Sequence, residues 1–354
     1  MSKPTAATYT IDNRSWIDRA KGICIILVVM MHTALGVEKV LGQTGFLHAI
    51  VAWTKPFRMP DFFLLSGFLA GTIGSLSWRA FADRRIVNYL YFYLLWLAIL
   101  TSLKLASDGA LSVDSFIRSY AMGFIEPFST LWFIYVLPVF MVVARFSRGW
   151  LAWAIGIIAT VLHVWAAAYP EGGVYAMSSQ AFGWIAPDSI ALFLIFFLSG
   201  YLGRSWIDRI PDLIRMAPRM GVAVLLFWAG IHSCASIAGV TSIPGLTIAF
   251  GLSGALAILI LAVLIERGPA LDWLAYCGRH SLAIYLAFVI PMAASRSLLV
   301  GKLGVTQPDI VMVTVLACAV LFPLVLERLV QPGPLRFLFV RPEWTRLIKT
   351  EARL

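Results

Sequence analysis

Long apolar runs separated by short polar segments dominate the chain between residues 22 and 330. The runs are continuous rather than alternating, which favours helices over the strands of a membrane barrel. A helix needs roughly 20 apolar residues to cross about 30 Å of hydrocarbon. The pattern therefore predicts an all-α, polytopic membrane protein with ten transmembrane helices. The expected spans are 22–41, 56–75, 86–104, 128–146, 150–168, 187–204, 219–238, 244–265, 281–299 and 310–330.

The distribution of Lys and Arg between the spans predicts the orientation. With ten spans both ends of the chain lie on one side, and that side carries 21 basic residues against 7 on the other. Because cytoplasmic loops are enriched in Lys and Arg, we expect both termini in the cytoplasm. The expected domains are a cytoplasmic segment (1–21), a ten-helix domain (22–330) and a basic cytoplasmic tail (331–354), which we expect to lie on the anionic leaflet.

The composition supports a membrane protein and narrows the chemistry. Of the 354 residues, 60% are hydrophobic and 13% are charged, whereas soluble domains are about 25% charged. The net charge of +10 is scattered between spans, so we attribute it to topology rather than to nucleic-acid binding. The four cysteines lie in or beside apolar runs, and we expect no disulfide framework, no metal site and no cleavable signal peptide.

His32 is the first polar feature of interest, because it lies in the middle of the run AKGICIILVVMMHTALGV. It follows Lys21 by eleven residues, or about 16 Å along a helix, which places it near the membrane midplane. A histidine there can act as a general base or as a hydrogen-bond partner between helices, and the residues alone leave both open. Lys21 alone fits a snorkelling interfacial lysine. For His163 and His232 we favour a packing role.

Several charged residues lie near predicted span ends. Arg84 and Arg85 form a basic pair that can either bind a phosphorylated donor or mark the cytoplasmic side. Arg58 and Asp61 lie three residues apart at the predicted outer end of span two, where opposite charges can pair. Glu126, just outside span four, is either an acceptor-orienting carboxylate or a solvated loop residue.

A short internal echo links FLLSGFL (63–69) with FFLSGYL (196–202). The small residues in each segment, such as Ser66 and Gly67, have two possible roles. They either let helices approach closely or line a narrow path for a long, thin part of a ligand, where larger side chains would block it. Both interpretations stay open at this stage.

Four stretches in order make the chain similar to the integral-membrane acyltransferase-3 family, the O-acetylases of bacterial surface glycans, and to its fucose 4-O-acetylase-like branch. They are WIDRAKGICIILVVMMH, FRMPDFFLLSGFLAG, STLWFIYVL and YCGRHSLAIYLAF. The chain departs from the family pattern at three points. Arg84-Arg85 lacks the second arginine of an Arg-x-x-Arg, Thr130 stands where a histidine is frequent, and Asp61 replaces an apolar residue.

The resemblance implies transfer of an acyl group, with acetyl as the preferred candidate, from cytoplasmic acyl-CoA to a hydroxyl of a cell-surface or lipid-linked glycan. It also implies a location in the bacterial inner membrane. It implies no metal. A transporter or flippase of a glycan or lipid is the alternative, although clear inverted repeats are missing. The predicted site residues are His32 and Lys21 for catalysis; Arg84, Arg85, Ser66 and Gly67 for acyl-CoA; and Arg58, Asp61, Glu126, Trp132 and Tyr285 for the acceptor.

Overall fold

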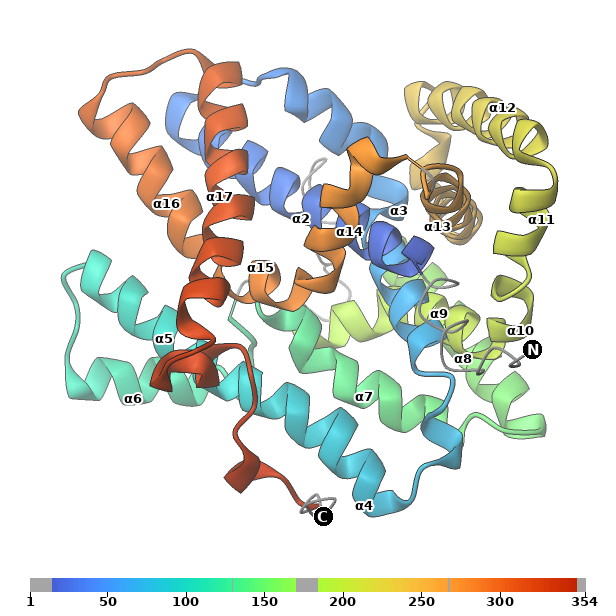
Figure 1. The fold of residues 1–354 in the computed structure, drawn as a ribbon, viewed down its shortest axis with the longest axis horizontal. Helices are drawn as coiled ribbons and strands as arrows, with labels where there is room; N and C mark the ends of the chain where they lie inside the picture. Colours follow the sequence, from blue (N-terminus) through green and yellow to red (C-terminus); the bar gives the residue numbers. More distant parts are fainter. Residues whose placement is uncertain (1–14, 129, 170–183, 267, 349–354) are drawn as a thin grey trace, which may run out of the picture.

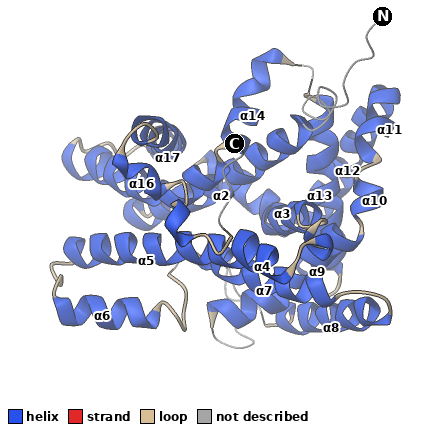
Figure 2. Cartoon of the chain, turned by 60° about the horizontal axis from the view of Figure 1, so that its bottom comes forward, coloured by secondary structure: helices blue, strands red, loops and turns tan. Residues whose placement is uncertain are grey.

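A computed structural model describes residues 15–128, 130–169, 184–266 and 268–348. The described part of the chain consists of helices and connecting turns, without strands (Figures 1 and 2). The helices of eight or more residues are α2 (Ser15–Leu41), α3 (Phe46–Leu69), α5 (Asn88–Ser107), α6 (Val113–Met122), α7 (Trp132–Phe146), α8 (Trp150–Ala167), α9 (Ile185–Leu202), α12 (Pro218–Ile237), α13 (Leu246–Leu264), α14 (Asp272–Arg279), α16 (Val289–Arg296) and α17 (Pro308–Val330). Shorter helices are α4 (Trp78–Phe81), α10 (Arg204–Ile207), α11 (Ile210–Met216) and α15 (Ser281–Ala287).

Seven of the described helices are long and apolar enough to cross a membrane. An eighth span arises if Ser281–Ala287 and Val289–Lys302, which meet at a bend of 51°, are counted together. This confirms an all-α, multi-span membrane protein. The predicted spans at 56–75 and 128–146 correspond to α3, which carries several charges, and to α7, which has only 15 residues. The number ten stays a prediction.

The start of α3 differs from the expected boundary. The helix begins at Phe46, ten residues before the predicted start, so Pro56 and Pro60 lie inside it rather than in its first turn. Prolines are tolerated inside membrane helices where neighbouring helices satisfy the freed carbonyls. As a consequence, Arg58 and Asp61 lie mid-helix and are buried, not at a helix end.

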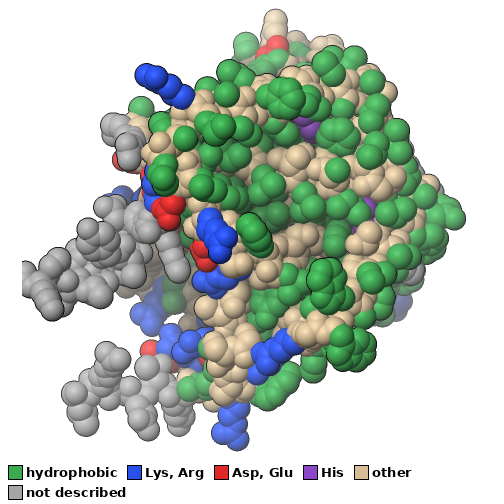
Figure 3. All heavy atoms as spheres, turned by 90° about the vertical axis from the view of Figure 1, so that its right-hand side faces the viewer, with side chains coloured by type: hydrophobic (Ala, Val, Ile, Leu, Met, Phe, Trp, Pro, Cys, Tyr) green, Lys and Arg blue, Asp and Glu red, His purple; other side chains and the backbone are tan. Residues whose placement is uncertain are grey.

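The helices divide into a central and a peripheral set. In the most apolar stretches of α2 and α9, 56% of residues are buried in the protein, against 17% in α8 and 11% in α12. The side of the molecule around α11 and α12 is covered by hydrophobic side chains, with Lys and Arg gathered toward one side of the view (Figure 3). Such a surface suits contact with lipid.

Two reciprocal glycine contacts bring central helices together. A Cβ on Gly67 would lie 2.9 Å from the Phe197 carbonyl carbon, and one on Gly200 would lie 2.8 Å from that of Leu64. Gly22 and Gly278 make the same kind of contact between α2 and α14. The α3–α9 contact contains both copies of the sequence echo, and close backbone approach is what small residues allow in membrane helices.

The tail beyond α17 packs back onto the helices. Trp96 Nε1 donates to the Leu338 carbonyl at 3.0 Å, and Tyr91 Oη donates to that of Phe337 at 2.9 Å. Arg341 is nine-tenths buried and its guanidinium forms an ion pair with Asp83 at 2.5 Å. The described part of the tail is therefore held against α5 and the turn before it, and its placement on a leaflet stays a prediction.

Candidate functional site

His32 lines a small internal cavity formed by α2, α3, α7 and α15. The cavity measures about 20 Å³, enough for one water molecule. Trp132 and Tyr285 also line it, so the structure brings together three of the predicted site residues. Neither ring nitrogen of His32 makes a hydrogen bond to a described residue, and its ring lies 5.3 Å from that of Phe288. The imidazole is therefore free to accept a proton from a ligand.

Thr130 is the site residue that sequence reasoning missed. It lines the same cavity, is 8% exposed, and its hydroxyl has no hydrogen-bond partner in the described chain. Tyr285 Oη donates to the Thr130 backbone carbonyl at 2.6 Å and so fixes the turn before α7. A buried hydroxyl without a partner is costly, which makes Thr130 a candidate to bind a ligand. Its position just before Leu-Trp-Phe was the signal in the sequence.

Lys21 lies on α2 with His32 but is not brought to the cavity. Its Nζ forms an ion pair with Asp18 at 2.8 Å, and both side chains are partly exposed. Eleven residues of helix separate it from His32 by about 16 Å. The predicted catalytic role of Lys21 stays a prediction.

Arg58 and Asp61 do not form the ion pair that their spacing allowed. Arg58 Nη1 donates to the Val51 carbonyl at 3.2 Å, and Nη2 lies 2.8 Å from the sulfur of Met31, a residue that lines the cavity. Both carboxylate oxygens of Asp61 are buried and have no hydrogen-bond partner among described residues. The acceptor role predicted for both residues stays a prediction.

Glu126 binds the start of another helix. Its Oε1 accepts a hydrogen bond of 3.0 Å from the backbone amide of Ile185, at the N-terminus of α9. A carboxylate there also interacts favourably with the helix dipole. Glu126 thus connects the loop before α7 to α9, and its predicted contact with an acceptor stays a prediction.

Arg84 and Arg85 lie in the π-helical segment Ala82–Val87, which leads into α5. Arg84 is exposed and Arg85 is partly buried. Their neighbour Asp83 holds Arg341 and also accepts from the Leu347 amide at 2.8 Å, so the tail packs beside this basic pair. Donor binding by the pair is untested.

Ser66 and Gly67 are used for helix packing. Gly67 faces the α9 backbone with no space for another group, and Ser66 Oγ donates to the Phe62 carbonyl of its own helix at 2.7 Å. Of the two interpretations of the echo, close helix approach fits Gly67. The α9 backbone lies against Gly67, and the predicted contact of Ser66 and Gly67 with acyl-CoA stays a prediction.

The remaining intramembrane histidines have structural partners. The ring nitrogens of His163 lie 2.7 Å from the Leu192 carbonyl and 2.7 Å from Thr247 Oγ1, joining α8, α9 and α13. His232 Nε2 lies 2.9 Å from the Trp53 carbonyl. The packing role predicted for His163 is confirmed by these two contacts, whereas His232 Nδ1 is buried without a hydrogen-bond partner among the described residues. Within the described residues, no three His, Cys, Asp or Glu side chains gather as a metal site would require.

Fold and cavity together define a multi-span, all-α membrane protein with a partnerless histidine and a partnerless hydroxyl facing one internal space. Residues 14–327 match the model of a family described as an acyltransferase domain. The match covers most of the chain, so the chain belongs to this acyltransferase family, and the resemblance seen in the four sequence stretches is confirmed.

The inner membrane protein YcfT of Escherichia coli (strain K12) is a relative, 32% identical over 160 residues. The matched region covers 38% of this chain and 44% of YcfT, which is less than half of that relative's length. No solved structure matches the chain.

Proposed function

We propose that the chain is a membrane O-acyltransferase that moves an acyl group from acyl-CoA to a hydroxyl of a cell-surface or lipid-linked glycan. Acetyl is the acyl group that we propose. The membership of the acyltransferase family supports the reaction class. The observation that carries the proposal is the cavity lined by both His32, without a hydrogen-bond partner among the described residues, and Thr130, whose hydroxyl is unpaired. The relative YcfT is an inner membrane protein, which supports a bacterial inner membrane location, with both termini in the cytoplasm as the basic residues predict.

In the proposed reaction His32 acts as the general base. It takes the proton of the acceptor hydroxyl while the oxygen attacks the thioester carbonyl carbon. The tetrahedral intermediate then collapses, the C–S bond breaks, and the CoA thiolate takes the proton back from His32. Proton transfer by a positioned base contributes typically about 10²–10⁴-fold in rate.

Thr130 has a second role in this proposal. The intermediate carries an oxyanion that needs a hydrogen-bond donor already in place. Thr130 lines the same cavity as His32 and its buried hydroxyl donates to no described residue, while Tyr285 Oη is engaged with a backbone carbonyl. Thr130 is therefore the better placed of the two to donate to the oxyanion.

The test incubates purified protein with labelled acetyl-CoA and candidate glycans, and follows transfer of the label. His32→Ala should lower transfer at least about 10²-fold while the protein stays folded and monodisperse. His48→Ala is the matched control, because His48 lies at the start of α3 beside Glu38, away from the cavity. Full activity of the His32 variant would refute the proposed base. Absence of transfer by wild type, together with glycan export in vesicles, would favour the transporter alternative.

A further inference from the structure

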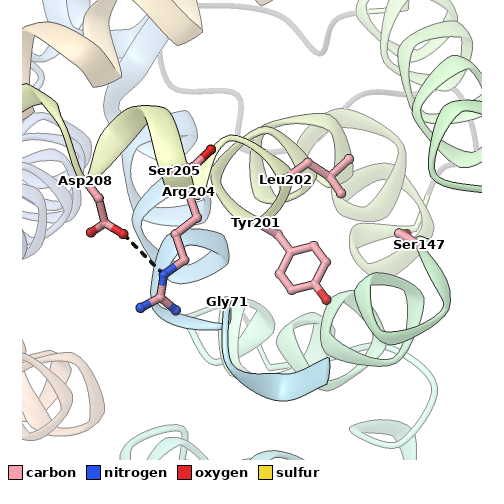
Figure 4. A pocket seen from close by; sticks show the side chains of 7 residues that line it. All are labelled: Gly71, Ser147, Tyr201, Leu202, Arg204, Ser205 and Asp208. Atoms are coloured by element: carbon pink, nitrogen blue, oxygen red, sulfur yellow. Dashed lines mark ion pairs between the residues drawn. The ribbon is translucent and has the colours of Figure 1, made fainter. Parts of the chain in front are cut away.

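A second hollow, of about 480 Å³, lies beyond the C-terminal ends of α3 and α7, whereas the His32 cavity lies farther back along both helices. The polar or small residues that line it are Gly71, Ser147, Tyr201, Arg204, Ser205 and Asp208. Figure 4 shows Tyr201 at the end of α9 and Arg204 at the start of α10, with the Arg204 side chain pointing toward the turn that carries Gly71. These helix ends are the ones that the distribution of basic residues assigns to the cytoplasm.

Two glycines leave room for two guanidinium groups on this turn. A Cβ on Gly71 would lie 3.0 Å from Arg204 Nε and closer still to Cδ and Nη1. A Cβ on Gly74 would lie 2.9 Å from Arg148 Nη2, which donates to the Gly74 carbonyl at 2.7 Å. The arginines therefore rest on the turn itself, in positions that any larger residue would disturb.

The hollow presents more hydrogen-bond donors than the described chain uses. Arg204 Nε lies 3.5 Å from the half-exposed carboxylate of Asp208, but its Nη1 and Nη2 donate to no described residue. Tyr201 Oη would lie 3.6 Å from a Cβ on Gly74, on the same side as Arg148. Guanidinium forks with neighbouring hydroxyls are the groups that proteins use to bind phosphate.

The spacing between the two hollows suits a long, thin donor. Phe62 lines the His32 cavity and Gly71 lines the second hollow, and nine residues of α3 correspond to about 14 Å. Along α7, Phe133 and Ser147 line the two hollows and are about 21 Å apart. The separation is of the order of an extended pantetheine arm, which joins the nucleotide of CoA to its thioester.

We propose that this second hollow binds the phosphates of the acyl donor's nucleotide, with Arg204 as the principal contact. The proposal rests on the proposed acyl-CoA-dependent function and assigns the donor's charged end to a place other than Arg84 and Arg85. Asp208 holds Arg204 only through the distant Nε contact, so the guanidinium fork stays available to a phosphate.

The test measures binding, not turnover. Full-length protein in detergent is titrated calorimetrically with CoA and with adenosine 3′,5′-bisphosphate, the nucleotide end alone. Arg204→Gln should weaken both at least tenfold, and Gly71→Ala should weaken both by displacing Arg204 without removing its charge. Arg209→Gln is the matched control, because Arg209 lies over the Trp206 ring and does not line the hollow; it should change binding less than twofold.

The outcomes separate this proposal from the function it rests on. If wild type binds CoA and Arg204→Gln binds it equally well, the hollow is not the donor site, while the proposed acyltransferase function stands. If wild type binds no CoA, the proposed donor is wrong and both proposals fail. If phosphatidylglycerol in the micelles displaces the nucleotide in an Arg204-dependent manner, the hollow is a lipid headgroup site and the donor assignment is overturned.

Discussion

Replacing Gly200 by alanine should separate α3 from α9 and destabilise the whole protein. The added Cβ would lie 2.8 Å from the Leu64 carbonyl carbon and 2.9 Å from the Phe68 amide nitrogen, with the Leu64 oxygen nearer still. Ordinary contacts of this kind begin at 3.4 Å. These atoms belong to a helix backbone, so they cannot rotate away as a flexible side chain would, and the helices must move apart by about half an ångström or more.

The magnitude follows from the packing that this movement loses. Overpacking a tight site costs typically about 1–3 kcal/mol, and a gap of 0.5–1 Å forfeits roughly a quarter to a half of each affected dispersion contact. The matched control is Gly230→Ala in α12, where a Cβ would meet nothing within 4 Å. This control should be neutral or gain up to about 1 kcal/mol of helix propensity.

The two variants should therefore differ by about 1–4 kcal/mol, or roughly 1–5 °C in melting temperature for a chain of this length. The assay heats detergent-solubilised protein and follows the monodisperse peak by fluorescence-detected size exclusion. If Gly200→Ala melts within about 1 °C of Gly230→Ala, the close α3–α9 contact does not hold the bundle together, and the packing interpretation of the sequence echo is wrong.

Two further predictions concern the cavity and the tail. Thr130→Val should lower kcat for acyl transfer about 10²-fold with little change in KM, and Thr130→Ser should restore most of it; a loss confined to KM would instead make Thr130 a binding residue. Arg341→Ala should remove the charge-assisted hydrogen bonds that Arg341 donates to Asp83, which costs about 1.5–3 kcal/mol, and should expose the tail to limited proteolysis. Arg336→Ala, which changes an exposed arginine of the same tail, is the control and should leave the proteolysis pattern unchanged.

The apolar runs predicted most helices to within a few residues, because lipid-facing helices must be apolar along their length. The prediction was poorest at α3, where its start at Phe46 was missed. That helix packs against α2, α9 and α13, and a helix enclosed by protein can carry charged residues such as Arg58 without meeting lipid. Hydropathy measures contact with lipid, and for this reason it misplaced the start of the helix whose charged residues are enclosed by protein.

The candidate site was predicted in part, for a related reason. His32, Trp132 and Tyr285 stand in motifs whose order along the chain resembles a known family, and the fold brings them to one cavity. Thr130 could not be singled out, because an unpaired hydroxyl is a property of the packed structure. The same holds for Asp61, whose partnerless carboxylate is visible only once Arg58 is seen to bind elsewhere.

The position of the glycine contact constrains how a donor could connect the two hollows. Gly67 and Gly200 lie on the stretch of α3 and α9 near the second hollow. Their backbones are in direct contact, so no group can pass between the two helices here unless the helices separate. Around the same stretch the Phe140 ring packs between two others, with its centroid 5.1 Å from that of Phe63 and 5.5 Å from that of Phe197. A donor arm that passes here must therefore displace aromatic side chains, which can change rotamer, rather than separate the helices. The rigid contact would then fix the distance between phosphate site and base, while the rings control access to His32.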